Sequence, residues 1–530
     1  IEQYAGESFL EEILPIICRN TNQRDEWAEL FNVTIKSRND LIKQANWKNL
    51  PIDTRHFPES FKAKLLEALT KNKDLDEIID GVLVKSENYQ ALNLLAEKYR
   101  DKVQAIYIDP PFNKEQEADY LYNVKYKDAT WITMLENRLL LSREFLKDTG
   151  SIFVRCDYNG NMFVRLLMNE IFGEKNFRNE IIVRKTDYLS KREVNNFEQE
   201  TESLINYCKN YEKVLFRRIW LSREPKWVKM QEKPNKGKTG KPIIIDGKVF
   251  RPREGYCWAR GNEVANRMYK EGRLKIQNGK LYILLDKKAP GTNWTDIRGY
   301  SPEEAAIWRF STTNSEILLK RVVESTSNEG DVVMDFFVGS GTTTAVAHKL
   351  DRRWVGVEMG SFFEDTPLKR MKKVLFGEVS GISKEVNWKG GGFFKYHYLE
   401  QYEDALHNID FVNEEKGRRA LEAFGNNEEG YEYLMKYFLR YETEGSPSLL
   451  NVEYFKNPFE YKLKIVSNGK GEELVAVDLI ETFNYLIGLH VSKYKFVNDS
   501  GRKYVFVFGR RGGRKVAVVW RPTDNIDLEK

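Results

Sequence analysis

Two short segments of this chain carry residue types suited to chemistry on a planar amino group. The first is I-Y-I-D-P-P-F at 106–112, where an apolar strand runs into a carboxylate, two prolines and an aromatic ring. Two consecutive prolines fix φ and remove two N–H donors, so this elbow can only accept hydrogen bonds. Asp109 and the Pro110 carbonyl can then both accept from one NH2 group, while Phe112 offers a face for stacking. An ordinary proline turn at a strand end is the alternative.

The second segment is D-V-V-M-D-F-F-V-G-S-G-T-T-T at 331–344, a strand that feeds a glycine-rich turn and then a helix. Gly339 and Gly341 allow the backbone to approach a ligand closely. The turn is no Walker loop, because G-x-x-x-x-G-K is absent, and it lacks the third glycine of the dinucleotide fingerprint. The next strand ends at Glu358, where an acidic residue commonly accepts from ribose hydroxyls. This pattern favours an adenosine-containing ligand over a triphosphate, although Glu358 alone also fits a surface acid.

The elements that must position these residues alternate between strand and helix. Apolar β-rich runs at 103–108, 151–155, 180–183, 332–337 and 354–357 are separated by longer helical stretches, which predicts a mostly parallel α/β sheet. Ligands bind outside the carboxyl ends of such strands, where Asp109 and the glycine turn would both lie. One helix is predicted at 131–147, with Leu135, Leu139, Leu140 and Phe145 on its apolar stripe.

Size and composition exclude several classes of protein. At 530 residues the chain is long enough for about three domains, and 41% hydrophobic with 31% charged residues fits neither a disordered tail nor a membrane protein. The net charge of +5 permits a polyanionic partner without demanding one. Four scattered cysteines without a C-x-x-C pair, and no His at metal-ligand spacing, argue against a structural zinc, and we expect no metal site. We expect a soluble protein of the reducing cytoplasm, with no membrane partner.

The alternation of strands and helices stops between 186 and 300, where the sequence becomes basic and aromatic and contains many Gly and Pro residues. Phosphate-binding cations beside aromatic surfaces suit a nucleic acid, although a solvated surface loop is the alternative. The candidate DNA-binding residues of this insert are Lys226, Lys229, Lys236, Lys238, Lys241, Arg251 and Arg253.

These patterns divide the chain into five parts. We expect an N-terminal helical region at 1–80, the two halves of one α/β domain at 81–185 and 301–365, the insert at 186–300, and a C-terminal α+β region at 366–530. In the last part, W-K-G-G-G-F-F at 388–394 predicts a flexible joint after the end of the sheet. A hairpin is predicted from strands at 504–508 and 515–520 around the turn at 509–513.

Taken together, D-P-P-F at 109–112 and F-V-G-S-G at 337–341 resemble the amino-methyltransferases that use S-adenosylmethionine. In detail the chain is similar to the β-ordered DNA adenine-N6 group, which includes the modification subunits of type III restriction systems. In that group the D-P-P-[YF] segment precedes a target-recognition insert and the cofactor loop follows it, as here. The resemblance implies a Rossmann-like, S-adenosylmethionine-dependent methyltransferase fold with an inserted target-recognition domain and an additional C-terminal α+β region.

Carried over residue by residue, the resemblance implies a catalytic elbow of Asp109, Pro110, Pro111 and Phe112 that holds and stacks on a flipped-out base. The residues implied to bind S-adenosylmethionine are Glu87, Asn88, Asp335, Phe337, Gly339, Ser340, Gly341, Thr342 and Glu358. Two departures affect the cofactor site. Ser86 replaces the glycine of the usual G-D-N, and T-T-N-S at 312–315 stands in place of a common K-P pair.

The resemblance implies a site-specific DNA methyltransferase acting on adenine N6 in double-stranded DNA, as the modification component of a restriction-modification system. A second copy of the chain and a helicase-nuclease restriction subunit are candidate partners. Four other readings stay open: a cytosine-N4 target, a catalytically silent DNA-binding subunit, an RNA methyltransferase, and a protein amide methyltransferase. The intact D-P-P-F disfavours the silent subunit, and the long insert favours DNA.

Overall fold

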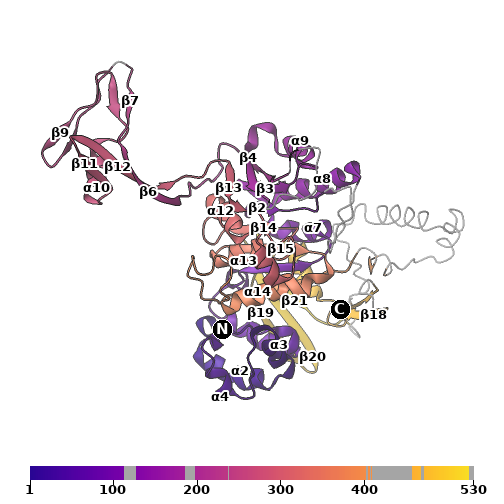
Figure 1. The fold of residues 1–530 in the computed structure, drawn as a ribbon. Helices are drawn as coiled ribbons and strands as arrows, with labels where there is room; N and C mark the ends of the chain where they lie inside the picture. Colours follow the sequence, from indigo (N-terminus) through magenta and orange to yellow (C-terminus); the bar gives the residue numbers. More distant parts are fainter. Residues whose placement is uncertain are drawn as a thin grey trace. The chain divides into compact units, whose positions relative to one another are not determined.

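The computed structural model describes residues 1–112, 127–185, 197, 199–236, 238–401, 404–405, 408, 456–466 and 471–523 (Figure 1). Parts of the predicted insert and of the predicted C-terminal region therefore lie outside the described residues. The chain forms two compact units. One consists of Ile1–Phe216 with Thr295–Lys530, and the other is Arg217–Trp294.

The first unit is built around a nine-stranded sheet in the order β13-β4-β5-β3-β2-β14-β15-β1-β16. The neighbours from β3 to β16 run parallel, whereas β5 is antiparallel to both β3 and β4. The strands are β1 (Gly81–Lys85), β2 (Val103–Ile108), β3 (Leu146–Cys156), β4 (Phe177–Arg184), β5 (Thr201–Cys208), β13 (Asn293–Arg298), β14 (Val332–Asp335), β15 (Arg353–Glu358) and β16 (Phe394–Tyr398). The predicted mostly parallel α/β sheet is confirmed.

Helices pack on this sheet because each buries one apolar stripe against strands that are apolar on both faces. The helices that matter for the site are α7 (Asn88–Tyr99), α8 (Asp128–Phe145), α9 (Asn161–Phe172), α11 (Pro302–Trp308), α12 (Glu316–Thr326), α13 (Thr342–Lys349) and α14 (Lys369–Phe376). In α8 the buried stripe contains Leu135, Leu139 and Phe145, but Leu140 is 49% exposed. The expectation for Leu140 is wrong. Successive residues of an α-helix are rotated by about 100°, so the residue after Leu139 points away from the stripe.

The N-terminal region is built from helices. It comprises α1 (Glu2–Ala5), α2 (Glu7–Arg19), α3 (Thr21–Phe31), α4 (Arg38–Ile42), α5 (Glu59–Leu69) and α6 (Leu75–Ile78). These helices share a core that contains Ile13, Leu14 and the fully buried Trp27. Short 3-10 turns lie between α4 and α5, at η1 (Trp47–Asn49) and η2 (Thr54–His56).

The sheet continues beyond the point where the sequence predicted its end. β16 pairs in parallel with β1, with Gly81 opposite Phe394, and so forms the edge strand after the predicted joint. The predicted joint is hydrogen-bonded to α14: the Trp388 indole donates to the Val374 carbonyl at 2.8 Å, and the Gly391 N–H donates to the Leu375 carbonyl at 2.7 Å. Three glycines in sequence predict conformational freedom, and here they allow close backbone packing.

The C-terminal part contains β17 (Lys462–Ile465), β18 (Glu473–Ala476), α18 (Leu479–Leu486), β19 (His490–Asp499), β20 (Arg502–Arg511) and β21 (Arg514–Trp520). β19, β20 and β21 form an antiparallel sheet. The predicted hairpin between β20 and β21 is confirmed, with a tighter turn than expected, because Arg511 already pairs with Arg514 across Gly512 and Gly513.

The second unit, Arg217–Trp294, lies inside the predicted insert 186–300 and is narrower than it, because β5 and most of β13 belong to the large sheet. It contains β6 (Leu221–Lys229), β7 (Glu232–Pro234), β8 (Ile243–Ile245), β9 (Lys248–Phe250), β10 (Tyr256–Trp258), α10 (Asn262–Lys270), β11 (Leu274–Gln277) and β12 (Lys280–Lys288). A small core that includes Met230, Ile245 and Leu281 holds it together.

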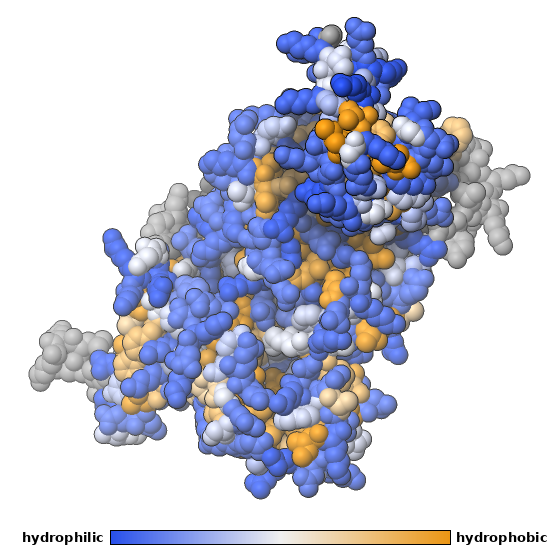
Figure 2. Space-filling view, turned by 90° about the vertical axis from the view of Figure 1, so that its left-hand side faces the viewer, coloured by the Kyte–Doolittle hydropathy of each residue, from blue (hydrophilic) through white to orange (hydrophobic). Residues whose placement is uncertain are grey.

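No helix within the described ranges combines the length and the apolar character that crossing a membrane would require. On the face shown in Figure 2, hydrophilic residues dominate and the apolar residues form separate patches.

A buried charge network joins α12, α13 and α14 behind the glycine turn. The Glu316 carboxylate accepts hydrogen bonds from Lys349 Nζ at 2.8 and 2.9 Å and from an Arg370 Nη at 2.8 Å. All three side chains are fully buried. Because removal of one partner from such a network leaves the other charges uncompensated, we expect Glu316 to be essential for the stability of this region.

We predict that Glu316→Gln lowers the free energy of unfolding by about 3–5 kcal/mol, measured by chemical denaturation. The matched control is Glu385→Gln, which removes an exposed carboxylate paired with Lys320. An exposed ion pair of this kind contributes at most about 1 kcal/mol. Equal losses in the two variants would contradict the importance that we assign to the buried network.

Candidate functional site

The carboxyl ends of four parallel strands meet at one edge of the sheet and bring the two predicted segments together. Asp109 directly follows β2, and the glycine turn follows the neighbouring strand β14, so these loops lie side by side. The loop after β1 joins them, because the Asn88 side-chain amide donates to the Phe336 carbonyl at 3.0 Å. The Gly339 N–H donates to the Glu358 carboxylate at 2.8 Å and links β14 to β15.

The Asp109 carboxylate is held from two sides. Asn314 Nδ2 donates a hydrogen bond to Asp109 Oδ2 at 2.9 Å, and Arg155 Nη1 lies 3.8 Å from the same oxygen. Tyr107 and Arg155 both donate to the Asn314 side-chain oxygen, which fixes the orientation of its amide. The Asp109 side chain retains 13% exposure. Asp109 is therefore oriented in a mostly buried setting by neutral and charged donors.

Arg155 is fully buried near the carboxyl end of β3, where a second carboxylate balances its charge. Its Nε and Nη2 donate to Glu202 Oε2 at 2.8 and 2.5 Å, and its guanidinium lies 4.0 Å from the centre of the Tyr300 ring. Burial alone would lower the pKa of Arg155, but the nearby Glu202 raises that pKa well above its ordinary value. Arg155 is therefore a permanent positive charge beside Asp109.

The rest of the predicted elbow is less exposed than the sequence suggested. The Trp131 indole N–H donates to the Pro111 carbonyl at 2.7 Å, which anchors the elbow to α8. Phe112 is 8% exposed and belongs to the core cluster of the sheet. In this structure its ring is packed, so a planar ligand could stack on it only after a local rearrangement.

The glycine turn has the backbone conformation that its sequence requires. Gly339 and Gly341 have φ values of 54° and 83°, in the left-handed region that favours glycine. Glu358 braces the turn, because its two carboxylate oxygens accept from the N–H groups of Gly339 and Gly360 at 2.8 and 2.7 Å. Burial raises the pKa of Glu358, although these hydrogen bonds oppose the rise.

Asp335 is a buried carboxyl group at the end of β14. It accepts hydrogen bonds from the Phe337 N–H at 2.9 Å and from the Thr343 hydroxyl at 2.6 Å. Burial raises the pKa of Asp335 to about 7, and the nearby carboxylates of Asp109 and Glu358 add to the rise. Three carboxyl groups thus converge on this edge of the sheet. The adjoining Phe337 side chain is half-buried.

Two of the predicted cofactor residues have side chains engaged elsewhere. Thr342 accepts a hydrogen bond from Arg370 Nη1 at 2.9 Å, and Ser340 lies 3.4 Å from the same nitrogen. Ser340 and Thr342 are 4% and 3% exposed. Their side chains therefore connect the turn to the buried Glu316 network, and only their backbone remains for contact with a ligand.

Glu87 and Asn88 lie at the start of α7. The Glu87 carboxylate caps the helix by accepting from the Gln90 N–H at 3.1 Å, and it forms an ion pair with Arg138 of α8. Arg138 Nε also donates to the Asn88 side-chain oxygen at 2.6 Å. Both polar side chains therefore already have partners within the protein. A ligand that binds Glu87 would compete with the ion pair between Glu87 and Arg138.

The seven predicted DNA-binding residues all lie in the second unit, and each of them is exposed. Arg253 forms an ion pair with Glu232 at 2.6 Å and stacks over the Tyr256 ring at 4.3 Å. Within the described part of the chain, no carboxylate pairs with the other six. They present unneutralised positive charge on a small domain with its own core.

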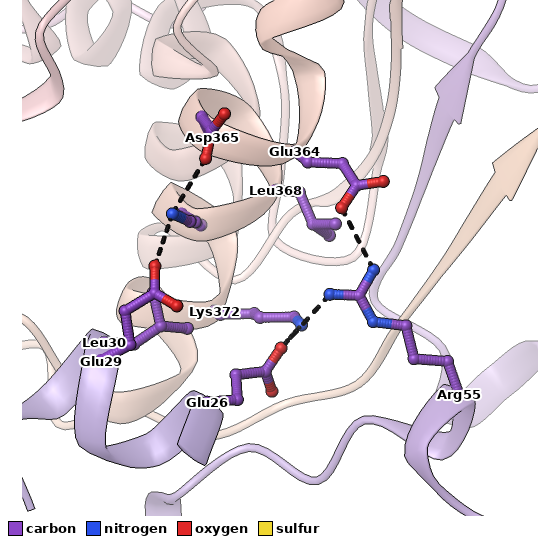
Figure 3. Close-up of a pocket in the computed structure, with 9 residues that line it drawn as sticks. Glu26, Glu29, Leu30, Arg55, Glu364, Asp365, Leu368 and Lys372 are labelled. Atoms are coloured by element: carbon purple, nitrogen blue, oxygen red, sulfur yellow. Dashed lines mark hydrogen bonds and ion pairs between the residues drawn. The ribbon is translucent and has the colours of Figure 1, made fainter. Parts of the chain in front are cut away.

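A separate cavity of about 310 Å³ lies between the N-terminal helices and the segment after β15 (Figure 3). Its lining comes from α3, η2, η5 (Glu364–Leu368) and α14, and contains none of the predicted site residues. Glu26, Asp53 and His56 are close enough to hold a metal ion. However, Lys372 Nζ already pairs with both Glu26 and Asp53. Burial would raise the pKa of Asp53, but Lys372 outweighs it and lowers that pKa.

The sequence interpretation missed the residues that orient the predicted ones. Asn314 was noted only as a departure from a family pattern, and Arg155 only as the end of a strand. A charged residue inside an apolar strand indicates a buried ion pair, which could have identified Arg155. No local signal could have connected Asn314 with Asp109, because 205 residues separate them.

We predict that Asp335 makes the stability of the protein depend on pH. Because the pKa of Asp335 is higher in the folded than in the unfolded chain, protonation of Asp335 stabilises the fold, and this contribution is complete at low pH. That contribution is lost as the pH rises from about 4 to about 7. Relative to Asp335→Asn, the free energy of unfolding of the unmodified chain should fall over this range. The slope should approach about 1.4 kcal/mol per pH unit.

Thr343→Val provides the matched variant for this test. It removes the hydroxyl that donates to Asp335 and lowers its pKa. The pH-dependent loss of stability should therefore extend above pH 7 in this variant. If the stability curves of Asp335→Asn and the unmodified chain run parallel from pH 4 to 8, Asp335 is not the titrating group.

Comparison with known proteins adds independent information. The family model described as DNA methylase matches residues 103–368, about half of the chain. The probable type III restriction-modification enzyme HindVI Mod subunit of Haemophilus influenzae is 28% identical over 408 residues, which cover 61% of this chain and 54% of that protein. The type II methyltransferase M.EcaI of Enterobacter cloacae is 27% identical over 323 residues, covering 56% and 71%.

The chain thus spans about half the length of the type III relative. Among solved structures, the M1.HpyAVI-SAM complex aligns with 55% of this chain and 98% of its own, at 17% identity and a TM-score of 0.32. The family match runs from β2 through the glycine turn to the segment after β15, and it includes both Asp109 and Glu358. The nine-stranded sheet is the Rossmann-like methyltransferase fold that the resemblance implied, and this chain belongs to the DNA methylase family.

Proposed function

We propose that this protein is a site-specific DNA methyltransferase that transfers a methyl group from S-adenosylmethionine to N6 of a flipped-out adenine. The observation that carries this proposal is the position of Asp109. Its carboxylate is oriented by Asn314 and Arg155 at the end of β2, directly beside the glycine turn on the neighbouring strand β14. An acceptor for an amino group and a ligand-binding turn therefore share one edge of the sheet.

The chemistry of the donor set fits S-adenosylmethionine. Asp109, Asp335 and Glu358 converge closely enough for Asp109 and Glu358 to raise the pKa of Asp335. Carboxyl groups that are buried together and have raised pKa values favour a cationic ligand, because a bound cation would stabilise their ionised forms. The cofactor has a sulfonium and an amino group. When bound, S-adenosylmethionine supplies an already activated methyl group. Glu358 would accept from the ribose hydroxyls, and the backbone of the glycine turn would lie against the ligand.

The residues of the chain then mainly need to align the target nitrogen. The nitrogen gains the methyl group as the bond between that methyl group and sulfur breaks, and the proton that it loses would pass to solvent. Asp109 and the Pro110 carbonyl would accept hydrogen bonds from the amino group and direct its lone pair toward the methyl group. Asn314 and Arg155 prevent the carboxylate from rotating. The base must leave the duplex to reach this position, at a cost of about a few kcal/mol. Contacts from the basic second unit would offset that cost.

The relatives favour a place in a restriction-modification system. Type III Mod subunits and a type II methyltransferase are among the proteins to which the chain is similar. We therefore propose that double-stranded DNA is the substrate and that the protein acts as a modification component. A restriction subunit and a second copy of this chain are its candidate partners.

We predict that Asp109→Ala and Phe112→Ala abolish methyl transfer while binding of S-adenosylmethionine survives. Asn314→Ala should lower kcat by about 10²-fold, because misplacement of an aligned group by about 1 Å has this effect. Single-turnover kinetics with radiolabelled cofactor measures the transfer, and calorimetry measures cofactor binding. Asn93→Ala, an exposed asparagine on α7, is the matched control. Unchanged turnover in Asp109→Ala would refute the role of the elbow.

Nucleoside analysis of the methylated DNA identifies the target atom. N6-methyladenine would support the proposal. N4-methylcytosine would show that the same mechanism acts on the amino group of cytosine instead. Methylation of RNA or of protein amides, with none of DNA, would refute the proposed substrate.

The second unit gives a further prediction. Lys236, Lys238 and Lys241 are exposed and unpaired among the described residues. If each neutralises one DNA phosphate, the triple change to Gln reduces the slope of log K against log salt by about 2.7. Affinity should fall similarly for cognate and unrelated duplexes. A triple change of exposed lysines elsewhere, at Lys36, Lys71 and Lys384, is the control. An equal effect of both triples would show that only the overall charge matters.

A further inference from the structure

The antiparallel sheet of β19, β20 and β21 has two faces of different character. One face is apolar and buried: Val491, Tyr494, Val505 and Val507 form a core with Leu75 of α6. Because successive residues of a strand point to opposite faces, the alternate positions form the outer face. Lys493 and Lys495 lie on this face in β19, opposite Phe508 and Phe506 of the central strand.

Aromatic residues occupy the middle of the outer face. Tyr504, Phe506 and Phe508 follow one another at every second position of β20, and all three are half-buried rather than covered. The rings of Phe506 and Phe508 are nearly parallel, with an interplanar angle of 9° and centres 6.4 Å apart. On β21, Ala517 and the 52% exposed Val519 extend the apolar surface. These three aromatic side chains on the central strand are called the aromatic platform below.

Positive charge surrounds this platform. The register of the three strands places five Lys and Arg residues, His490 and one acidic residue, Asp499, on the outer face. Among the described residues, none of the five cations pairs with a carboxylate, and Lys493 lies 5.4 Å from the centre of the Phe508 ring. The five are Lys493, Lys495, Arg502, Arg510 and Lys515.

We propose that this outer face binds single-stranded nucleic acid, with unpaired bases stacked on Phe506 and Phe508 and the phosphates held by the surrounding cations. Every base has a π-face, so aromatic platforms on sheets bind single strands with little sequence preference. A face that served only as a solvated surface would not need three aromatic residues at its centre. A duplex would use the cations but could not stack its paired bases on the rings.

This surface differs from the basic unit at 217–294 in position along the chain and in construction. The proposed binding of single strands goes beyond methyl transfer, because it gives the C-terminal sheet a role of its own. That role does not depend on which base is modified, and its test needs no methylation assay. The proposal would therefore stand if the proposed function failed.

The test measures binding of a fluorescent twelve-residue oligothymidine to the full chain by anisotropy. Phe506→Leu/Phe508→Leu keeps the apolar volume but removes the aromatic faces, and should weaken binding by about tenfold or more. Lys493→Gln/Lys495→Gln should reduce the slope of log K against log salt by about 1.4. Lys36→Gln/Lys71→Gln removes the same charge from exposed positions in the N-terminal region and should leave the affinity unchanged.

Photocrosslinking of a bromodeoxyuridine oligonucleotide identifies the place of contact independently of other basic surfaces. The crosslinked peptide should contain Phe506 or Phe508. Crosslinks confined to other parts of the chain would overturn the proposal, and so would unchanged affinity in the phenylalanine variant when its thermal unfolding is normal. Equal losses for duplex and single strand would also overturn it, because they would show phosphate contact without stacking.

Discussion

The hydrogen bond from Asn314 to Asp109 is the interaction on which the arrangement of the site depends. It connects the end of β2 with the segment before α12, and it is supported by Arg155, whose own charge is balanced by Glu202. Each member of this chain of contacts orients the next one. In a mostly buried setting such contacts are stronger than in water, because the local dielectric is low. The Asp109 carboxylate is therefore held in one orientation before any ligand arrives.

The glycine turn is held from the opposite side by a separate set of charges. Arg370 and Lys349 meet Glu316 behind the turn, and Arg370 also reaches the Thr342 hydroxyl. On the proposed ligand side, by contrast, the carboxyl groups of Asp335 and Glu358 lack such cations among the described residues, and burial raises both pKa values. Among the described residues, two buried carboxyl groups thus lie without a neighbouring cation at the place where we propose that the cofactor binds, and a bound cation would favour their ionised forms.

Two basic surfaces of different construction accompany this site. The second unit carries unpaired lysines on short strands and loops, a composition suited to phosphates. The C-terminal sheet has three aromatic residues on its central strand with cations on both neighbouring strands. The first surface suits a polyanion of any structure, and the second suits unpaired bases. Their separate cores, around Met230 and around Val505, allow each surface to be altered without disturbing the large sheet.

The sequence by itself determined the local features of this protein. The strand before Asp109, the conformation of Gly339 and Gly341 and the hairpin of β20 and β21 follow from residue types within a few positions of one another. Only the tertiary structure decided which distant groups meet. Asn314 reaches Asp109 across 205 residues, and β16 joins the sheet after a glycine run that resembles a linker. The side chains of Ser340 and Thr342 point to Arg370 rather than outward. The physical reason is that strand and turn propensities act over a few residues, whereas the pairing of buried charges depends on the packing of the whole domain.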